Sequence, residues 1–222
     1  MPVLPTPVVD TTDPADTAGT LIERTYLALG DSYTIGQSVA VSERFPVQTV
    51  ALLNNPLVKF EQPEIIAQSG WTTGNLLSRL NSTPPTKTRY DIVTLLIGVN
   101  NQYQGRSIEE YKQEFTTLLE RSIQYAGNNK SHVFVLSIPD YSVTPFVSAS
   151  NKDRVAREID SFNLANKTIA LQYQVNYIDI TPDSRLAATD ATLIANDGLH
   201  PSGAQYGFWA GKLAPAIRLL FP

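Results

Sequence analysis

The chain has 222 residues, of which 42% are hydrophobic and 17% are charged, and its formal net charge is -4. This length fits one α/β domain, and the negative charge gives no basic field for nucleic acid or an anionic membrane. The chain has no cysteine and only two histidines, which excludes disulfides and a zinc site built on sulfur and disfavours a multi-histidine metal centre. No apolar stretch approaches the length of a transmembrane helix, so we expect no transmembrane segment and no nucleic-acid partner.

The first residues have an unusual composition, rich in proline, threonine and aspartate. Residues 2–20 contain no aromatic and no basic side chain, so this segment cannot bury enough apolar surface to offset the entropy of ordering. We therefore expect a flexible N-terminal segment at 1–22, followed by one folded domain at 23–222. The segment lacks the charged and apolar regions of a signal peptide. A tether of this kind favours the hypothesis of an exported protein, periplasmic, secreted or lipid-anchored, whose signal sequence has been removed.

Short apolar runs alternate with segments of helical periodicity along the rest of the chain. Several of the runs are apolar on successive residues, which is typical of strands that are covered on both faces of a parallel sheet. The predicted strands span 25–29, 64–67, 91–97, 132–138 and 175–180.

The helical segments fall between these strands. Ser107 and Glu110 predict a capping box at the start of one helix, and the last helix is expected to begin at Pro201 because proline is favourable in a first turn. Strands and helices that alternate imply right-handed crossovers, which predicts a three-layer α/β/α sandwich around a parallel sheet. The other predicted helices lie at 46–54, 73–80 and 155–173.

Two sites far apart in the chain carry groups suited to nucleophilic catalysis. Ser32 lies where the first predicted strand gives way to Gly-Asp-Ser-Tyr at 30–33, and His200 follows Asp197 by three residues. A serine hydroxyl needs a base to take its proton, and a histidine oriented by a carboxylate is such a base. Each residue alone is compatible with a helix cap or a surface turn, but together they predict a serine nucleophile. The G-x-S-x-G pattern is absent, which excludes the nucleophile elbow of an α/β-hydrolase.

Acyl transfer also needs hydrogen-bond donors for the oxyanion that develops during attack. Gly70 follows a predicted strand and can offer its backbone N–H, and Asn100 follows the most apolar strand and can offer its side-chain amide. The backbone N–H of Ser32 is a third candidate. Gly70 is equally compatible with a plain turn, and Asn100 with a strand-end turn or a helix cap.

In this order the motifs resemble those of the SGNH hydrolases, also called GDSL-type esterases and lipases. The resemblance covers about residues 25–215. The matching blocks are Gly-Asp-Ser-Tyr at 30–33, Gly70, Gly98-x-Asn100 and Asp197-x-x-His200.

The resemblance implies a flavodoxin-like fold with a five-stranded parallel sheet. It also implies that Ser32 is the nucleophile, that His200 and Asp197 are its base and orienting acid, and that Ser32, Gly70 and Asn100 form the oxyanion hole. Neither a metal nor an organic cofactor is implied.

Two positions depart from the family's usual motifs. Tyr33 stands where leucine is more usual, and we expect it only to pack. Asn101 stands where aspartate is usual, so we expect the support of the neighbouring loop to differ.

Four aromatic residues follow strand ends and are candidates to line a substrate crevice, although each is equally compatible with packing. They suit a neutral, partly apolar substrate such as an acyl group or a sugar ring. These residues are Trp71, Tyr103, Tyr141 and Phe146.

Asp31 and His132 are the remaining titratable residues that need an interpretation. Asp31 is adjacent to Ser32, and we expect its side chain to cap local backbone N–H groups rather than to act as the orienting acid. His132 opens a predicted strand on the side away from the candidate site, so we expect it to be structural or exposed.

These patterns predict a serine esterase that cleaves short acyl esters through an acyl-enzyme, with O-acetyl esters of carbohydrates or small alcohols as its substrates. The alternatives are a lysophospholipase or thioesterase of the same fold, and a non-catalytic glycan-binding module. The presence of Ser32, Asn100 and His200 argues against the glycan-binding module.

Overall fold

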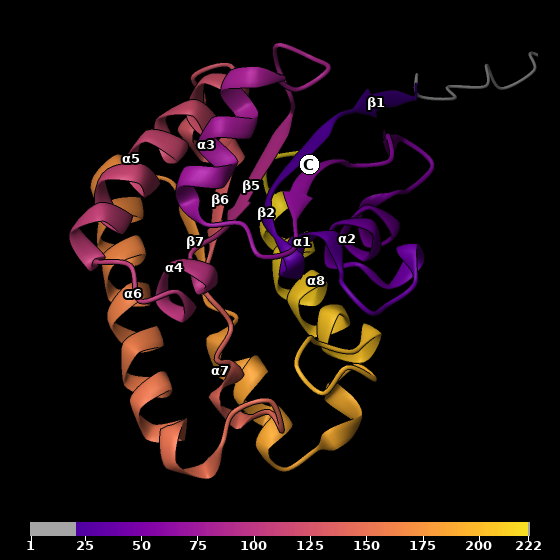
Figure 1. Cartoon of the computed structure of the whole chain (residues 1–222). Coiled ribbons are helices and arrows are strands. Elements are labelled where there is room, and N and C mark those ends of the chain that lie inside the picture. The colour runs from indigo at the N-terminus through magenta and orange to yellow at the C-terminus, as the bar shows by residue number, and fades with distance from the viewer. Residues whose placement is uncertain (1–20, 222) are drawn as a thin grey trace, which may run out of the picture.

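A computed structural model describes residues 21–221 of the chain. A five-stranded sheet forms its centre, with every neighbouring pair of strands parallel, and helices cover both faces of the sheet (Figure 1). The predicted α/β/α sandwich is therefore confirmed. The strands are β2 (Tyr26–Asp31), β4 (Glu64–Gln68), β5 (Ile92–Leu96), β6 (Val133–Leu136) and β7 (Asn176–Ile178).

A smaller second sheet lies at the start of the described chain. β1 (Ile22–Arg24) pairs in parallel with β3 (Val58–Phe60). The sequence did not indicate these strands, because three residues are too few for a recognisable pattern. Of the N-terminal segment expected at 1–22, residues 1–20 lie outside the described residues, and β1 begins at Ile22.

Two helical layers enclose the five-stranded sheet. On one side lie α3 (Thr73–Ser82), α5 (Ile108–Tyr125) and α6 (Lys152–Tyr173), and on the other lie α2 (Phe45–Leu53) and α8 (Gly203–Arg218) (Figure 1). None of the helices within residues 21–221 is both long and apolar enough to cross a membrane.

Short helical turns connect these larger elements. Three of them are α-helical: α1 (Ser32–Ile35), α4 (Val99–Tyr103) and α7 (Thr181–Arg185). The 3₁₀ turns are η1 (Val41–Glu43), η2 (Lys130–His132), η3 (Tyr141–Val143), η4 (Ala149–Asn151), η5 (Leu186–Ala188) and η6 (Ala191–Leu193).

The apolar pattern of the strands explains the position of the core. Every residue of β2, β5 and β6 is buried, because helices cover both faces of these central strands. The one side-chain hydrogen bond that joins β2 to β5 is also buried, and it links the Tyr26 hydroxyl to the Thr94 hydroxyl at 3.0 Å. On α8, Tyr206, Trp209 and Leu213 are fully buried on the face that packs toward α2.

One predicted helix start is wrong, and one predicted capping box is only half formed. α8 begins at Gly203 rather than at Pro201, with Ser202 as its cap, because Pro201 instead forms an antiparallel bridge with Ile194. At α5 the Ser107 hydroxyl accepts from the Glu110 N–H at 3.1 Å, which is half of the expected capping box. The carboxylate of Glu110 pairs with Arg106 at 3.4 Å instead of returning to the cap residue.

The strand order places a crevice at one end of the sheet. The order β4-β2-β5-β6-β7 follows the flavodoxin-like pattern, in which the chain direction across the sheet reverses between β2 and β5. In such sheets, ligands bind beyond the carboxyl ends of the strands at this reversal. The segments that follow β4, β2 and β5 therefore meet at the expected site.

Gly30 allows the carboxyl end of strand β2 to lie close to β5. A methyl group built on Gly30 would approach the Thr34 hydroxyl and the backbone carbonyl of Leu96 more closely than real atoms do. The carbonyl belongs to the sheet and cannot move aside without breaking strand pairing. Only glycine fits here.

We expect Gly30→Ala to lower the free energy of unfolding by at least about 2 kcal/mol, because the new methyl group overpacks a rigid backbone. Urea denaturation measures the change. Gly211→Ala is a matched control, since its methyl group meets no atom within 4 Å and alanine favours a helix. Equal stability of the two variants would contradict the close approach at Gly30.

Candidate active site

Ser32 lies at the carboxyl end of the central strand β2 and begins α1. The preceding Asp31 is the helix cap, and its carboxylate accepts from the Tyr33 N–H at 3.0 Å, as the sequence predicts. The Ser32 side chain lines a cavity of about 220 Å³. We call it the Ser32 cavity.

His200 reaches the same cavity from the loop that precedes α8. Its Nδ1 lies 2.6 Å from Oδ2 of Asp197, and the imidazole is buried. The other oxygen of Asp197 accepts from the backbone N–H groups of Leu199 at 3.0 Å and His200 at 2.9 Å. Asp197 therefore fixes both the ring and the backbone that carries it.

A residue that sequence reasoning missed also contacts this carboxylate. The Ser38 hydroxyl donates to Oδ2 of Asp197 at 2.7 Å, and Ser38 has a backbone φ of 67°, a conformation uncommon for residues other than glycine. Partial burial by itself would raise the pKa of Asp197, but the hydrogen bonds from Ser38, His200 and Leu199 outweigh it and hold that pKa well below its usual range. The carboxylate is thus ionised across the neutral pH range.

The two other predicted donors lie at the same cavity. Gly70 follows β4 with a φ of 81°, and Asn100 is the second residue of α4, which follows β5. The Asn100 amide donates to the carbonyl of Trp71 at 3.0 Å, and a side-chain amide has a second N–H available for another acceptor. The structure brings Ser32, Gly70, Asn100 and His200 together around one space.

Trp71 does not line this cavity, so of the two interpretations left open for its ring, a crevice wall or packing, the structure favours packing. The ring is partly buried and packs against the hydrophobic core. Its backbone carbonyl contributes instead, because it holds the amide of Asn100 in place.

The two departures from the family motifs have clear structural roles. The Tyr33 ring is buried and packs against the His200 imidazole, with 5.2 Å between the ring centroids. It therefore helps to hold the imidazole, beyond the general packing that we expected.

Asn101 is fully buried and binds Thr73 at the start of α3. Its oxygen accepts from the Thr73 N–H at 3.0 Å, and its amide donates to the Thr73 hydroxyl at 2.7 Å. That hydroxyl donates its one hydrogen to Glu114. An aspartate at 101 would compete with Glu114 for the same hydrogen, so asparagine suits this environment.

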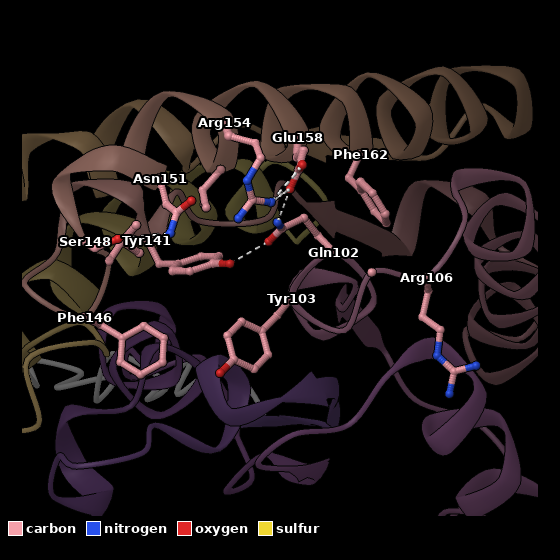
Figure 2. Close-up of a pocket in the computed structure, with 13 residues that line it drawn as sticks. Gln102, Tyr103, Arg106, Tyr141, Phe146, Ser148, Asn151, Arg154, Glu158 and Phe162 are labelled. Atoms are coloured by element: carbon pink, nitrogen blue, oxygen red, sulfur yellow. Dashed lines mark hydrogen bonds and ion pairs between the residues drawn. The ribbon is translucent and has the colours of Figure 1, made fainter.

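A larger cavity of about 640 Å³, drawn in Figure 2, shares lining residues with the Ser32 cavity and adjoins it. Tyr103, Tyr141 and Phe146 line both cavities, and their contact with substrate stays a prediction. The far wall comes from the first turns of α6 and includes Arg154 and Glu158 (Figure 2). We call it the Arg154 cavity.

Sequence reasoning did not single out Ser38, Arg154 or Glu158. Arg154 and Glu158 have the i,i+4 spacing of an ordinary surface ion pair, and Ser38 lies in a loop without a motif. Arg154 and Glu158 are recognised as lining a cavity only from the position of α6 beside the three aromatic rings.

His132 lies at the amino end of β6, away from both cavities, and its ring packs against Phe221 with 5.4 Å between centroids. This agrees with the structural interpretation.

The whole-chain comparisons agree with the fold and with the motifs. Residues 28–208 match the model of the GDSL-like lipase/acylhydrolase family. The chain belongs to this family, and it is accordingly a carboxylic ester hydrolase. A search of curated protein sequences found no match.

Solved structures with the same fold are distant in sequence. TesA is 18% identical with a TM-score of 0.70, covering 89% of this chain and 100% of TesA. Axe2, an acetylxylan esterase from Geobacillus stearothermophilus, is 20% identical with a TM-score of 0.67, covering 90% of this chain and 95% of Axe2. The psychrotrophic esterase EstA from Pseudoalteromonas sp. is 18% identical with a TM-score of 0.64, covering 89% of this chain and 98% of EstA. At these low sequence identities, the structural similarity establishes that this chain has the same fold as these proteins.

Asp31, directly before Ser32, is a buried acid with an unusual pKa. Burial raises the pKa of its carboxyl to about 7, and the hydrogen bond from the Tyr33 N–H offsets this only in part. Since the pKa of an aspartate in an unfolded chain is about 4, the folded protein holds a proton between about pH 4 and pH 7 that the unfolded chain releases. A rise in pH through this window therefore favours unfolding.

We expect Asp31→Asn to gain stability relative to the wild type as pH rises through this window. Asparagine keeps the cap acceptor but has no proton to lose, so the difference in unfolding free energy should grow by about 1.4 kcal/mol per pH unit. Urea denaturation of both proteins at pH 4, 5, 6 and 7 measures it. A difference that stays constant across this range would show that Asp31 titrates normally.

Proposed function

We propose that the protein hydrolyses short acyl esters through an acyl-enzyme formed on Ser32. The observation that carries this proposal is the common placement of Ser32, His200, Gly70 and Asn100 around the Ser32 cavity. Membership of the GDSL-like lipase/acylhydrolase family supports an ester as the substrate.

In the proposed mechanism, His200 is the general base. Its Nδ1 is held by Asp197 at 2.6 Å, which leaves Nε2 free to accept the proton of the Ser32 hydroxyl. The ionised carboxylate of Asp197 then stabilises the imidazolium that forms. The serine oxygen attacks the ester carbonyl, the imidazolium protonates the departing alcohol, and water activated by His200 later releases the acid.

The negative charge on the carbonyl oxygen needs donors in fixed positions. The N–H of Gly70, the N–H of Ser32 and the second amide N–H of Asn100 supply them in this proposal. The carbonyl of Trp71 fixes the Asn100 amide before substrate arrives, so little reorganisation is needed during attack.

The size of the Ser32 cavity favours a small acyl group. Its volume of about 220 Å³ is below the roughly 300–1,000 Å³ of sites that enclose a drug-sized ligand. O-acetyl esters of carbohydrates or small alcohols are therefore the proposed substrates. Axe2, which shares the fold, is an acetylxylan esterase, and this supports acetylated carbohydrates as the first class to test.

We expect Ser32→Ala to lower kcat for p-nitrophenyl acetate by about 1,000-fold or more, because the variant lacks the nucleophile. Ser161→Ala is the matched control, since Ser161 is exposed on α6 and its hydroxyl only donates to a backbone carbonyl. A series of p-nitrophenyl esters from C2 to C12 should show the highest kcat/KM at C2 to C4. Equal turnover by Ser32→Ala and the wild type would refute the proposed nucleophile, and a maximum at C10 or C12 would refute the short acyl preference.

The contact between Ser38 and Asp197 gives a separate prediction. Ser38→Ala and Ser38→Gly should each lower kcat/KM by a few-fold, up to about tenfold, because both lose a hydrogen bond to a charged group at an exposed position. Glycine tolerates the positive φ of this residue, so Ser38→Gly should be the more stable of the two in thermal unfolding. Full activity in Ser38→Gly but not in Ser38→Ala would show that the backbone matters and the hydroxyl does not.

A further inference from the structure

The Arg154 cavity has no role in the reaction described above, yet it opens directly beside the Ser32 cavity. Three aromatic rings form the shared wall: Tyr103 lies 6.3 Å from Tyr141 and 6.0 Å from Phe146, measured between centroids. Figure 2 shows the rings of Tyr103 and Phe146 side by side at this wall. Tyr103 and Phe146 are 59% and 49% exposed, so both present large ring surfaces to a ligand.

A chain of hydrogen bonds makes the opposite wall polar and fixed (Figure 2). The Tyr141 hydroxyl donates to Gln102 at 2.8 Å, and the Gln102 amide donates to Glu158 at 2.6 Å. Nη1 of Arg154 contacts both oxygens of Glu158, at 3.0 and 2.9 Å. The remaining N–H groups of the guanidinium and the side-chain oxygen of Asn151 are available to a ligand in the cavity.

The charges of this wall favour a neutral ligand. The cation of Arg154 is paired with Glu158, and Arg106, at the other end of the cavity, is paired with Glu110. An anionic group such as a phosphate would be repelled by the carboxylate of Glu158. It would also have to displace a carboxylate from each of the two arginines. An acyl tail is also a poor fit, because it would strip water from the Arg154–Glu158 ion pair without replacing the lost hydrogen bonds.

We propose that the Arg154 cavity binds a neutral glycosyl unit in the alcohol portion of the ester, an inference that rests on the proposed esterase function. A sugar ring offers an apolar face that packs on the rings of Tyr103 and Phe146 and hydroxyl groups that bond to Arg154, Glu158 and Asn151. The volume of about 640 Å³ lies within the range of sites that enclose a whole ligand, unlike the Ser32 cavity. The acyl group thus lies at Ser32, and the saccharide extends past the aromatic wall toward α6.

The test compares substrates that differ in their alcohol and acyl parts. For the wild type and each variant, kcat/KM is measured on O-acetylated xylotetraose, p-nitrophenyl acetate and p-nitrophenyl decanoate. Arg154→Ala should lower the ratio of kcat/KM for the saccharide to that for p-nitrophenyl acetate by about tenfold or more. Glu158→Gln should lower the same ratio by several-fold, since it keeps the shape of the side chain but removes the charge that holds Arg154.

Arg157→Ala is the matched control, because Arg157 is exposed on the same helix and does not line the cavity. For this variant, the ratio of kcat/KM for the saccharide to that for p-nitrophenyl acetate should equal the wild-type ratio. Circular dichroism should show that all three variants fold. The inference is overturned if Arg154→Ala and Arg157→Ala give the same ratio, if Arg154→Ala changes the decanoate-to-acetate ratio instead, or if the wild type does not cleave the acetylated saccharide. These outcomes leave the proposed nucleophile and acyl-enzyme intact, and those fail if Ser32→Ala retains wild-type turnover of p-nitrophenyl acetate.

Discussion

The parallel pairing of β2 with both β4 and β5 is the constraint on which the rest of the site depends. In register, Gly30 lies opposite Ala67 on β4 and opposite Leu96 on β5, so the three strands end at the same level. Ser32, Gly70 and Asn100 follow these ends and line one part of the Ser32 cavity. The pairing itself requires a residue without a side chain at 30, because the backbone of Leu96 occupies the space where a methyl group would lie. A requirement of sheet packing thus determines where the serine hydroxyl emerges.

The carboxylate of Asp197 is the second point of organisation, because it joins two loops that are far apart in the sequence. It accepts from Ser38, in the loop after α1, and from Leu199 and His200 in the loop before α8. The imidazole that it orients also packs against Tyr33, next to Ser32. The candidate base is therefore held by hydrogen bonds on one side and by an aromatic ring on the other, which limits the freedom of its ring before substrate binds.

The two adjoining cavities divide the proposed substrate by its chemistry. The Ser32 cavity is small and collects donors for a single carbonyl oxygen, whereas the Arg154 cavity is larger and combines exposed rings with an ion pair. Tyr103, Tyr141 and Phe146 belong to both, so a ligand that spans them contacts aromatic surface at the junction. α6 contributes only to the second cavity, which allows the alcohol preference to change through α6 while the reacting groups stay the same.

The sequence by itself determined the layer architecture, the five central strands and the family, because continuous apolar runs and short motifs are local properties of the chain. It also indicated which residue types gather beyond the strand ends, and the roles assigned to them remain predictions. Only the tertiary structure decided that Trp71 contributes its carbonyl rather than its ring, that Asn101 shares Thr73 with Glu114, and that Ser38 binds Asp197. It also decided that α6 faces the aromatic wall. Each of these contacts joins side chains distant in sequence, so the packing of elements sets them and no local pattern records them.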